Sequence, residues 1–138
     1  AHDAASARNL DAEDYTVSSS NEIQQVVESM VGKVDVVYTP TDNTIAAGMT
    51  TVTMITNDNK LPTICGEEGM VDNGGLATYG INYEELGKLA GQMAVKILKG
   101  ESKPADMAIE HLDASKCTLK TNEETAKKLG IDLSVLNS

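Results

Sequence analysis

The sequence predicts an α/β fold with a doubly wound, open parallel sheet, and three observations support this prediction. Short apolar runs alternate along the chain with helical segments of about 10–16 residues. Runs such as residues 34–38 show almost no polar alternation, which is typical of strands covered on both faces. The length of 138 residues and the hydrophobic content of 41% are enough for one domain with its own core. That core has to be aliphatic, because the only aromatic residues are four tyrosines.

The first half of the chain contains two of these alternations. Residues 3–9 are predicted to be the end of a helix that runs into a strand at 14–17. Ser20, or a neighbouring serine, is a good N-cap for the next helix, which ends at Gly32. Four apolar residues recur at helical spacing in that helix: Ile23, Val26, Val27 and Met30. A strand over 34–38 then leads into a single helix over 42–57.

The second half continues the pattern. A strand over 61–65, a glycine-rich connection with room for a helical turn, and a strand over 76–81 precede the strongest helix of the chain, at 83–99. Gly100 ends that helix. Six residues form its apolar side: Leu86, Leu89, Ala90, Met93, Ile97 and Leu98. The segments 107–112 and 117–120 are predicted as a late strand pair. The chain then ends with a helix that begins at Thr121 or Asn122 and stops at Gly130.

Charge and cysteine content exclude several classes of function. The net charge of −10 argues against a nucleic-acid or anionic-membrane surface, because both need clustered lysine and arginine. No segment approaches the roughly 18 consecutive apolar residues of a membrane helix. Cys65 and Cys117 are not in a metal-ligand spacing, and we expect Cys65 to be a buried thiol. Their redox state, including a disulfide between them, stays open.

Three predicted strands end in unusually polar turns. Ligands bind beyond the carboxyl ends of the strands in open α/β sheets, so a parallel arrangement would bring these turns to one edge. Eight residues of these turns are the candidate ligand contacts: Ser18, Ser20, Thr39, Thr41, Asp42, Asn43, Glu67 and Glu68. Hydroxyl groups and helix amide groups could hold a carboxylate, and an acidic side chain could hold an ammonium group. Together they predict a site for a zwitterion such as an amino acid.

Each of these residue types also has a purely structural role. A serine or aspartate before a helix is commonly an N-cap, and an acidic pair in a turn is commonly solvated. The composition by itself therefore indicates only a small polar ligand.

Enzyme signatures are absent from the sequence. It contains no GxxxxGK[ST] phosphate loop, no GxGxxG after a strand and no GxSxG nucleophile elbow. Ser18 to Ser20 have no histidine base, since His2 and His111 lie in segments expected to be structural or exposed. Asp42 follows a strand as a phospho-acceptor aspartate does, but the acidic pair and the lysine of that chemistry are missing. We expect no catalytic activity, cofactor or metal.

Several segments in combination resemble a known family. "PTDNT", "GEEGMV", "GGLATYGI" and "KILKGE", at their separations in this chain, closely resemble the carboxyl-terminal half of ABC-transporter solute-binding proteins of the tryptophan/tyrosine family. The similarity runs from about Asp14 to the end of the chain. It implies one lobe of a type I periplasmic-binding-protein fold, which closes on its ligand by a hinge motion. It also implies an extracellular, lipid-anchored protein that delivers a solute to a membrane permease.

The resemblance carries further expectations. The ligand would contact the "SSSN", "TPTDN" and "GEEG" turns, with the acidic side chains holding its ammonium group and the hydroxyl and amide groups its carboxylate. Members of this family are about twice as long, so the chain is expected to be an incomplete carboxyl-terminal portion, 1–138, that binds ligand poorly. The helix over 83–100 is expected to cross to the missing lobe, and the uncovered apolar surface to favour self-association.

Two other functions stay open at this stage. The ligand-sensing domain of a transcriptional regulator shares this fold, although no basic helix-turn-helix segment is present. A flavodoxin-like carrier would need a phosphate loop rich in hydroxyl groups, for which "SSSN" is the only sign. The identity of the solute also stays open, because the stacking partner for an aromatic ring would be Tyr38, Tyr79 or a residue on the missing lobe.

Overall fold

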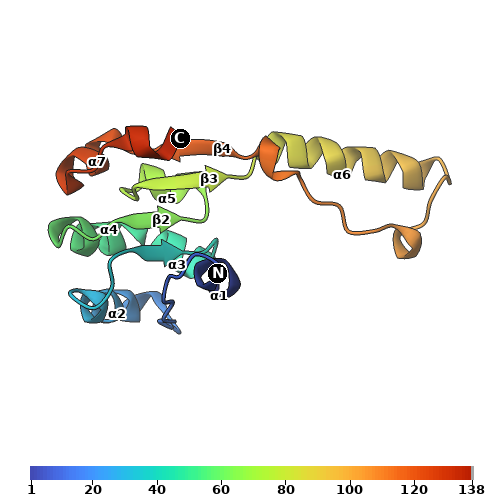
Figure 1. Ribbon diagram of the computed structural model, residues 1–138. Coiled ribbons are helices and arrows are strands. Elements are labelled where there is room, and N and C mark those ends of the chain that lie inside the picture. The colour runs from blue at the N-terminus through green and yellow to red at the C-terminus, as the bar shows by residue number, and fades with distance from the viewer. Residues whose placement is uncertain (138) are drawn as a thin grey trace.

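The computed structural model describes residues 1–137 and shows a body built on an open sheet, from which one long helix projects (Figure 1). The sheet has four strands in the order of the sequence: β1 (Val37–Thr39), β2 (Thr63–Cys65), β3 (Ala77–Gly80) and β4 (Thr118–Thr121). The α/β fold class and the open sheet are therefore confirmed. The first three strands are parallel, but β4 is antiparallel to β3, so the sheet is mixed.

The direction of β4 follows from the path of the chain between β3 and β4. The chain leaves the carboxyl end of β3 and runs out through α6 (Tyr83–Leu98). It returns through η2 (Pro104–Asp106) and η3 (Ala114–Lys116) to the same end, where Thr118 pairs with Gly80. We call this excursion, residues 81–117, the limb. The prediction of a strand at 107–112 is wrong, because these residues lie along the limb, away from the sheet.

The strand predicted at 14–17 is also absent. These residues follow α1 (His2–Ser6) as coil and line a pocket together with β1, but they pair with no strand. β1 therefore stands at the edge of the sheet. The amide of Val37 donates to the Pro62 carbonyl oxygen and the carbonyl oxygen of Thr39 accepts from Gly66, so both residues face β2. Because neighbouring residues of a strand alternate, the amide and carbonyl of Tyr38 face the open edge.

The helices of the first half depart from the sequence prediction at two points. Ser19 is the N-cap of η1 (Ser20–Glu22) and Glu22 that of α2 (Ile23–Met30), but neither side chain makes a capping hydrogen bond. The predicted helix over 42–57 is two helices, α3 (Asn43–Ala47) and α4 (Met49–Asp58). They meet at Gly48, where a Cβ atom would collide with the side chain of Ile23. The absence of a side chain at Gly48 thus lets Ile23, at the start of α2, pack closely against this corner.

The last helices agree well with the sequence. α5 (Glu68–Asp72) is the helical turn of the glycine-rich connection. α7 (Glu123–Leu129) begins at Asn122, whose side-chain oxygen accepts from the Thr125 amide at 2.9 Å. It ends at Gly130, which has a left-handed backbone with φ of +75°. η4 (Leu133–Asn137) follows.

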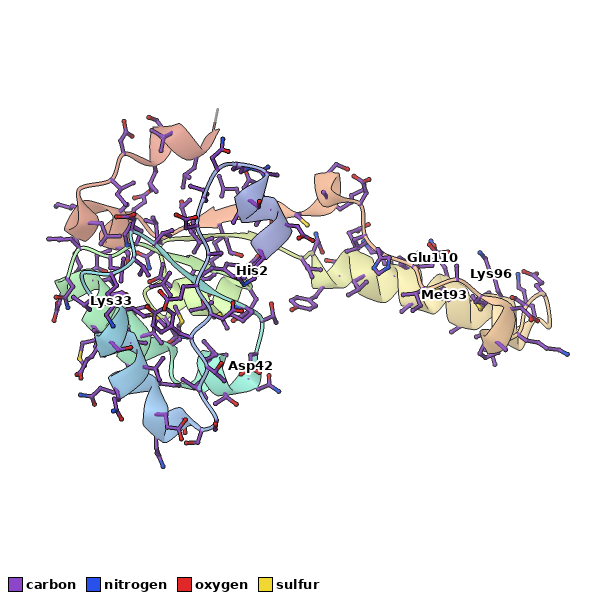
Figure 2. All side chains as sticks on the ribbon, turned by 60° about the horizontal axis from the view of Figure 1, so that its bottom comes forward. His2, Lys33, Asp42, Met93, Lys96 and Glu110 are labelled. Atoms are coloured by element: carbon purple, nitrogen blue, oxygen red, sulfur yellow. The ribbon has the colours of Figure 1, made fainter. Side chains whose placement is uncertain are left out.

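The core of the body is aliphatic and sulfur-containing, as predicted. Its main cluster consists of eight buried residues: Ile23, Val27, Met49, Val52, Ile55, Cys65, Met70 and Val71. A second cluster joins Leu76 and Ala77 to Ala126 of α7. In contrast, α6 has no buried residue, although its apolar side includes Met93, which Figure 2 shows in the limb. The body is therefore the packed part of the chain.

The two cysteines are free thiols in different surroundings. Cys65 is 3% exposed, and burial raises the pKa of its thiol, whereas Cys117 is half-buried at the base of the limb. We expect a thiol reagent at mildly alkaline pH to modify Cys117 at least about tenfold faster than Cys65, because the thiolate is the reactive form. A Cys117→Ser variant should retain only the slow thiol until denaturant is added. Equal rates in the native protein would contradict the burial of Cys65.

Candidate functional site

Two of the three predicted polar turns meet directly at the carboxyl edge of the sheet. The hydroxyl of Thr41, after β1, donates to the carbonyl oxygen of Gly66, after β2, at 3.1 Å. The Gly66 amide in turn donates to the Thr39 carbonyl oxygen at 2.8 Å. The third turn joins them less closely: η1, which contains Ser20, contacts α3 just beyond Asp42. We call this edge, from the Asp42 turn to the Glu68 turn, the rim.

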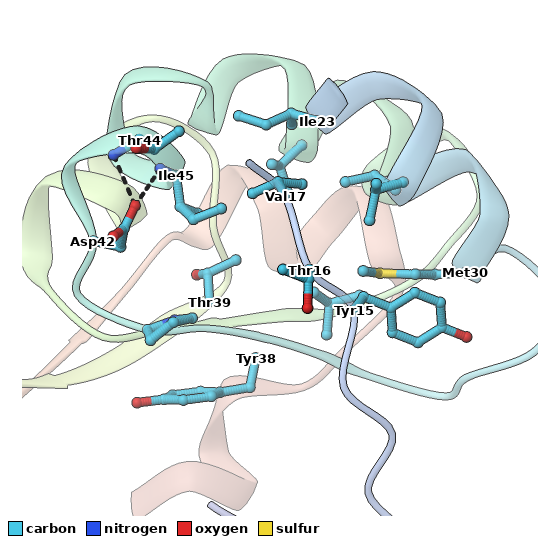
Figure 3. Close-up of a pocket in the computed structure, with 15 residues that line it drawn as sticks. Tyr15, Thr16, Val17, Ile23, Met30, Tyr38, Thr39, Asp42, Thr44 and Ile45 are labelled. Carbon is cyan, nitrogen blue, oxygen red and sulfur yellow. Dashed lines mark hydrogen bonds between the residues drawn. The ribbon is translucent and has the colours of Figure 1, made fainter. Parts of the chain in front are cut away.

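Asp42 caps the first helix of the rim. Its Oδ1 atom accepts hydrogen bonds from the amides of Thr44 at 2.8 Å and Ile45 at 3.0 Å (Figure 3). Both bonds go to one oxygen, so Oδ2 makes no hydrogen bond within residues 1–137. The side chain is exposed and carries its charge toward solvent. Asp42 therefore stabilises α3 and retains one oxygen for a ligand.

Glu67 caps α5 with both of its carboxylate oxygens. Oε2 accepts from the Gly69 amide and Oε1 from the Met70 amide, each at 2.9 Å. Two amides at the start of α3 and two at the start of α5 are thus occupied by side chains of this chain. These four amides are not free to bind a ligand carboxylate, because Asp42 and Glu67 already satisfy them.

Glu68 is placed differently from Glu67. Its Oε1 atom accepts one hydrogen bond, from the hydroxyl of Thr118 on β4, at 3.2 Å. No lysine, arginine or histidine in the described chain forms an ion pair with it. Lys120, on the same strand as Thr118, pairs with Asp72 at 2.7 Å. That hydrogen bond, and the negative charge of Glu68 to a smaller degree, raise the pKa of Lys120.

The remaining candidate ligand contacts differ in solvent exposure. Thr39 is 5% exposed, and its hydroxyl oxygen lies 3.5 Å from both the Ile64 carbonyl oxygen and Met70 Sδ. It lies within β1 rather than after it, which turns the side chain into the core. The other hydroxyl and amide candidates are exposed: Thr41 and Asn43 in the rim, and Ser18 and Ser20 in the turn before α2.

Two pockets adjoin the rim. The first has a volume of about 290 Å³ and lies between α2, β1 and the start of α3, next to Asp42 and the coil at 15–17 (Figure 3). The second has a volume of about 400 Å³ and lies at the base of the limb. Six residues line the second pocket: Glu67, Glu68, Ile81, Asn82, Tyr83 and Thr118.

Four residues of the second pocket were missed by the sequence analysis. Ile81, Asn82 and Tyr83 follow β3, so the same strand-end rule could have found them. Thr118 had no comparable signal, because it comes from the antiparallel strand β4. Among residues 1–137 there is no group of three acidic, histidine or cysteine side chains suited to a metal ion. No helix in this part of the chain is long and apolar enough to span a membrane.

The cap makes Asp42 testable by stability alone. Asp42→Ala removes the acceptor for two amides of α3 and should lower the free energy of unfolding by about 1 kcal/mol. Asp42→Ser keeps a capping oxygen and should recover most of that loss. Urea denaturation of the three proteins measures both differences. Equal loss in the two variants would show that the aspartate acts through its charge rather than as a cap.

The fold and the rim together define a class of protein. The carboxyl edge of the parallel strands is where open α/β folds generally hold small ligands, and this lobe has carboxylates and hydroxyls at that edge. The family model described as ABC transporter substrate binding protein matches residues 2–136 of this chain. The chain belongs to this family. This family is neither that of flavodoxin-like carriers nor that of regulator sensing domains, the two alternatives left open by the sequence.

Similar proteins agree with this assignment. Over 128 residues, the chain is 42% identical to a tyrosine-binding protein of Clostridioides difficile strain R20291, covering 93% of this chain and 36% of that protein. It is similar to the ABC domain in complex with L-Trp from Streptococcus pneumoniae, with a TM-score of 0.81 and 38% identity over 96% of this chain and 45% of that one. A ligand-free, open substrate-binding protein with adhesive properties from Clostridium difficile has a TM-score of 0.72 and 41% identity, covering 94% and 43% of the two chains. The chain thus spans less than half the length of these relatives.

Proposed function

We propose that this chain forms one ligand-binding lobe of the extracellular substrate-binding component of an ABC importer, which captures an aromatic amino acid. The observation that carries the proposal is the meeting of acidic turns at one sheet edge, where Asp42 and Glu68 each retain acceptor capacity for an ammonium group. The relatives that bind tyrosine and L-Trp support the same ligand class. In this role the protein has no catalytic activity and hands its solute to a membrane permease.

The rest of the binding cleft lies outside this chain. The relatives are more than twice as long as the part matched here, so a second lobe would face the rim and close over the ligand. The limb supports this arrangement, because α6 projects from the body (Figure 1). The helix has no buried residue and exposes large apolar side chains. We propose that the helical part of the limb, residues 83–100, crosses to that second lobe. We also propose that the longer protein carries a lipid anchor outside the cell.

The test is thermal unfolding of the longer protein that contains this chain, measured with each of the twenty amino acids, several sugars and several nucleosides. A ligand present at about 100 times its dissociation constant should stabilise the folded protein by roughly 2.7 kcal/mol. We expect tyrosine, tryptophan or phenylalanine to raise the melting temperature, and sugars and nucleosides to leave it unchanged. A shift with a sugar or a nucleoside alone would overturn the assignment to an amino acid.

The uncovered surface predicts how the isolated chain should behave. Leu98 and Ile109 of the limb are 86% and 84% exposed, and Tyr38 at the sheet edge is 56% exposed. Surfaces of this kind favour association between copies. Sedimentation velocity should therefore show the 138-residue chain shifting to larger species as its concentration rises, whereas the longer protein should not shift. A single monomeric species at all concentrations would contradict the prediction.

A further inference from the structure

We propose that the pocket at the base of the limb is the subsite for the ammonium group and the ring of the ligand, with Glu68 rather than Glu67 or Asp42 as the main ammonium acceptor. This assignment rests on the proposed function, and it selects one carboxylate among the three at the rim. It also adds Asn82 and Tyr83, which follow β3, to the ligand contacts.

The three carboxylates differ in the number of hydrogen bonds that each already accepts. Glu67 is committed through both oxygens to the amides at the start of α5. Asp42 is committed through one oxygen to two amides of α3. Glu68 accepts a single bond from a neutral hydroxyl and has no cation partner within the described residues. It is half-buried, so an ammonium group there would form charge-assisted hydrogen bonds with a carboxylate that has no ion-pair partner among the described residues.

The side chain of Glu68 is held in position by the ends of β3 and β4. Thr118 on β4 donates to its Oε1 atom. On the other side, β3 ends in Gly80, where a Cβ atom would lie 2.7 Å from Glu68 Cγ and 2.9 Å from Oε1. The side chain therefore lies against the ends of two paired strands, and only a residue without a side chain leaves it that space. Such prior placement lowers the entropy lost when a ligand binds.

The other walls of the pocket include a hydrogen-bond donor and two mainly apolar side chains. The side-chain oxygen of Asn82 accepts from the Glu85 amide at 3.1 Å, which leaves its Nδ2 group as a donor without a partner among residues 1–137. Ile81 and Tyr83 are 41% and 60% exposed although both are large and mainly apolar. The pocket thus combines an acceptor for an ammonium group, a donor for a carboxylate and an apolar side for a ring. Its volume of about 400 Å³ is within the usual range of small-ligand pockets.

The experiment is isothermal titration calorimetry of the longer protein with tyrosine, tryptophan and 3-(4-hydroxyphenyl)propanoate, which is tyrosine without its amino group. Glu68→Gln should weaken tyrosine and tryptophan binding at least about tenfold while leaving the melting temperature of the ligand-free protein unchanged. The matched control is Glu110→Gln, an exposed glutamate of the limb that should bind like wild type (Figure 2). Tyr83→Ala, which removes a wall of the pocket, should also weaken binding.

The amine-free analogue separates a direct contact from an indirect one. Wild-type protein should bind it at least about tenfold more weakly than tyrosine, and this difference should largely disappear in Glu68→Gln if Glu68 holds the ammonium group. An unchanged affinity in Glu68→Gln, with binding lost in the Asp42 or Glu67 variant, would overturn the assignment while leaving the proposed function intact. If wild-type protein binds none of the amino acids, the proposed function fails, and this assignment fails with it.

Discussion

Replacing Met49 with alanine is expected to lower the free energy of unfolding by about 2–5 kcal/mol. Met49 is fully buried in the main core cluster, at the start of α4. Truncation removes its contacts with the surrounding core residues and leaves a cavity that a packed core fills only in part. An effect of this size is a large share of the stability of a small domain.

Met54, on the same helix, provides the matched control. It is 58% exposed, so Met54→Ala removes the same atoms from the surface rather than from the core, and we expect a change within about 0.5 kcal/mol. Urea denaturation of the two variants and the wild type measures both differences. Similar losses for Met49→Ala and Met54→Ala would mean that α4 does not face the core as described.

Replacing Gly66 with alanine is expected to be nearly as damaging, for a different reason. A Cβ atom at this position would lie 2.6 Å from the Thr41 amide nitrogen and 2.9 Å from the Pro40 carbonyl carbon. Both are backbone atoms, so the two turns of the rim have to move apart. We expect a loss of about 1–3 kcal/mol, together with weaker amino-acid binding by the longer protein.

Gly87 is the control for Gly66. It lies within α6, where an added Cβ atom meets nothing within 4 Å, and alanine favours a helix by about 1 kcal/mol over glycine. Gly87→Ala should therefore leave the 138-residue chain at least as stable as wild type. If Gly66→Ala instead matches wild type in both stability and binding, the close approach of the two turns is not needed for the rim.

The elements that the sequence predicted well carry their own local signals. α7 has an asparagine cap at its start and a glycine with positive φ at its end, and α6 is amphipathic over its whole length. The departures depend on partners distant in the chain. The helix predicted over 42–57 is divided at Gly48, where Ile23, distant in the chain, occupies the space that a side chain would need. The direction of β4 depends on where the limb returns, which no local pattern encodes.

In the candidate site, too, some features follow from local sequence and others depend on the folded structure. The strand-end rule predicted Asp42, Glu67 and Glu68, because it needs only strand positions and direction. It could not show that Glu67 is used as a cap while Glu68 is not, since both are glutamates in one turn. Thr39 was assigned to a turn because the strand ends one residue later than predicted.

The limb begins and ends at one residue pair of the sheet, Gly80 opposite Thr118. This affects which changes in the length of the limb the fold tolerates. To the body, the whole excursion is a long hairpin loop, and the entropic cost of closing a loop rises only slowly with its length. Insertions or deletions far out on the limb should therefore change the stability of the body little. They would, however, alter how far α6 reaches, so the span between two lobes could be adjusted while the core and the rim keep their sequence.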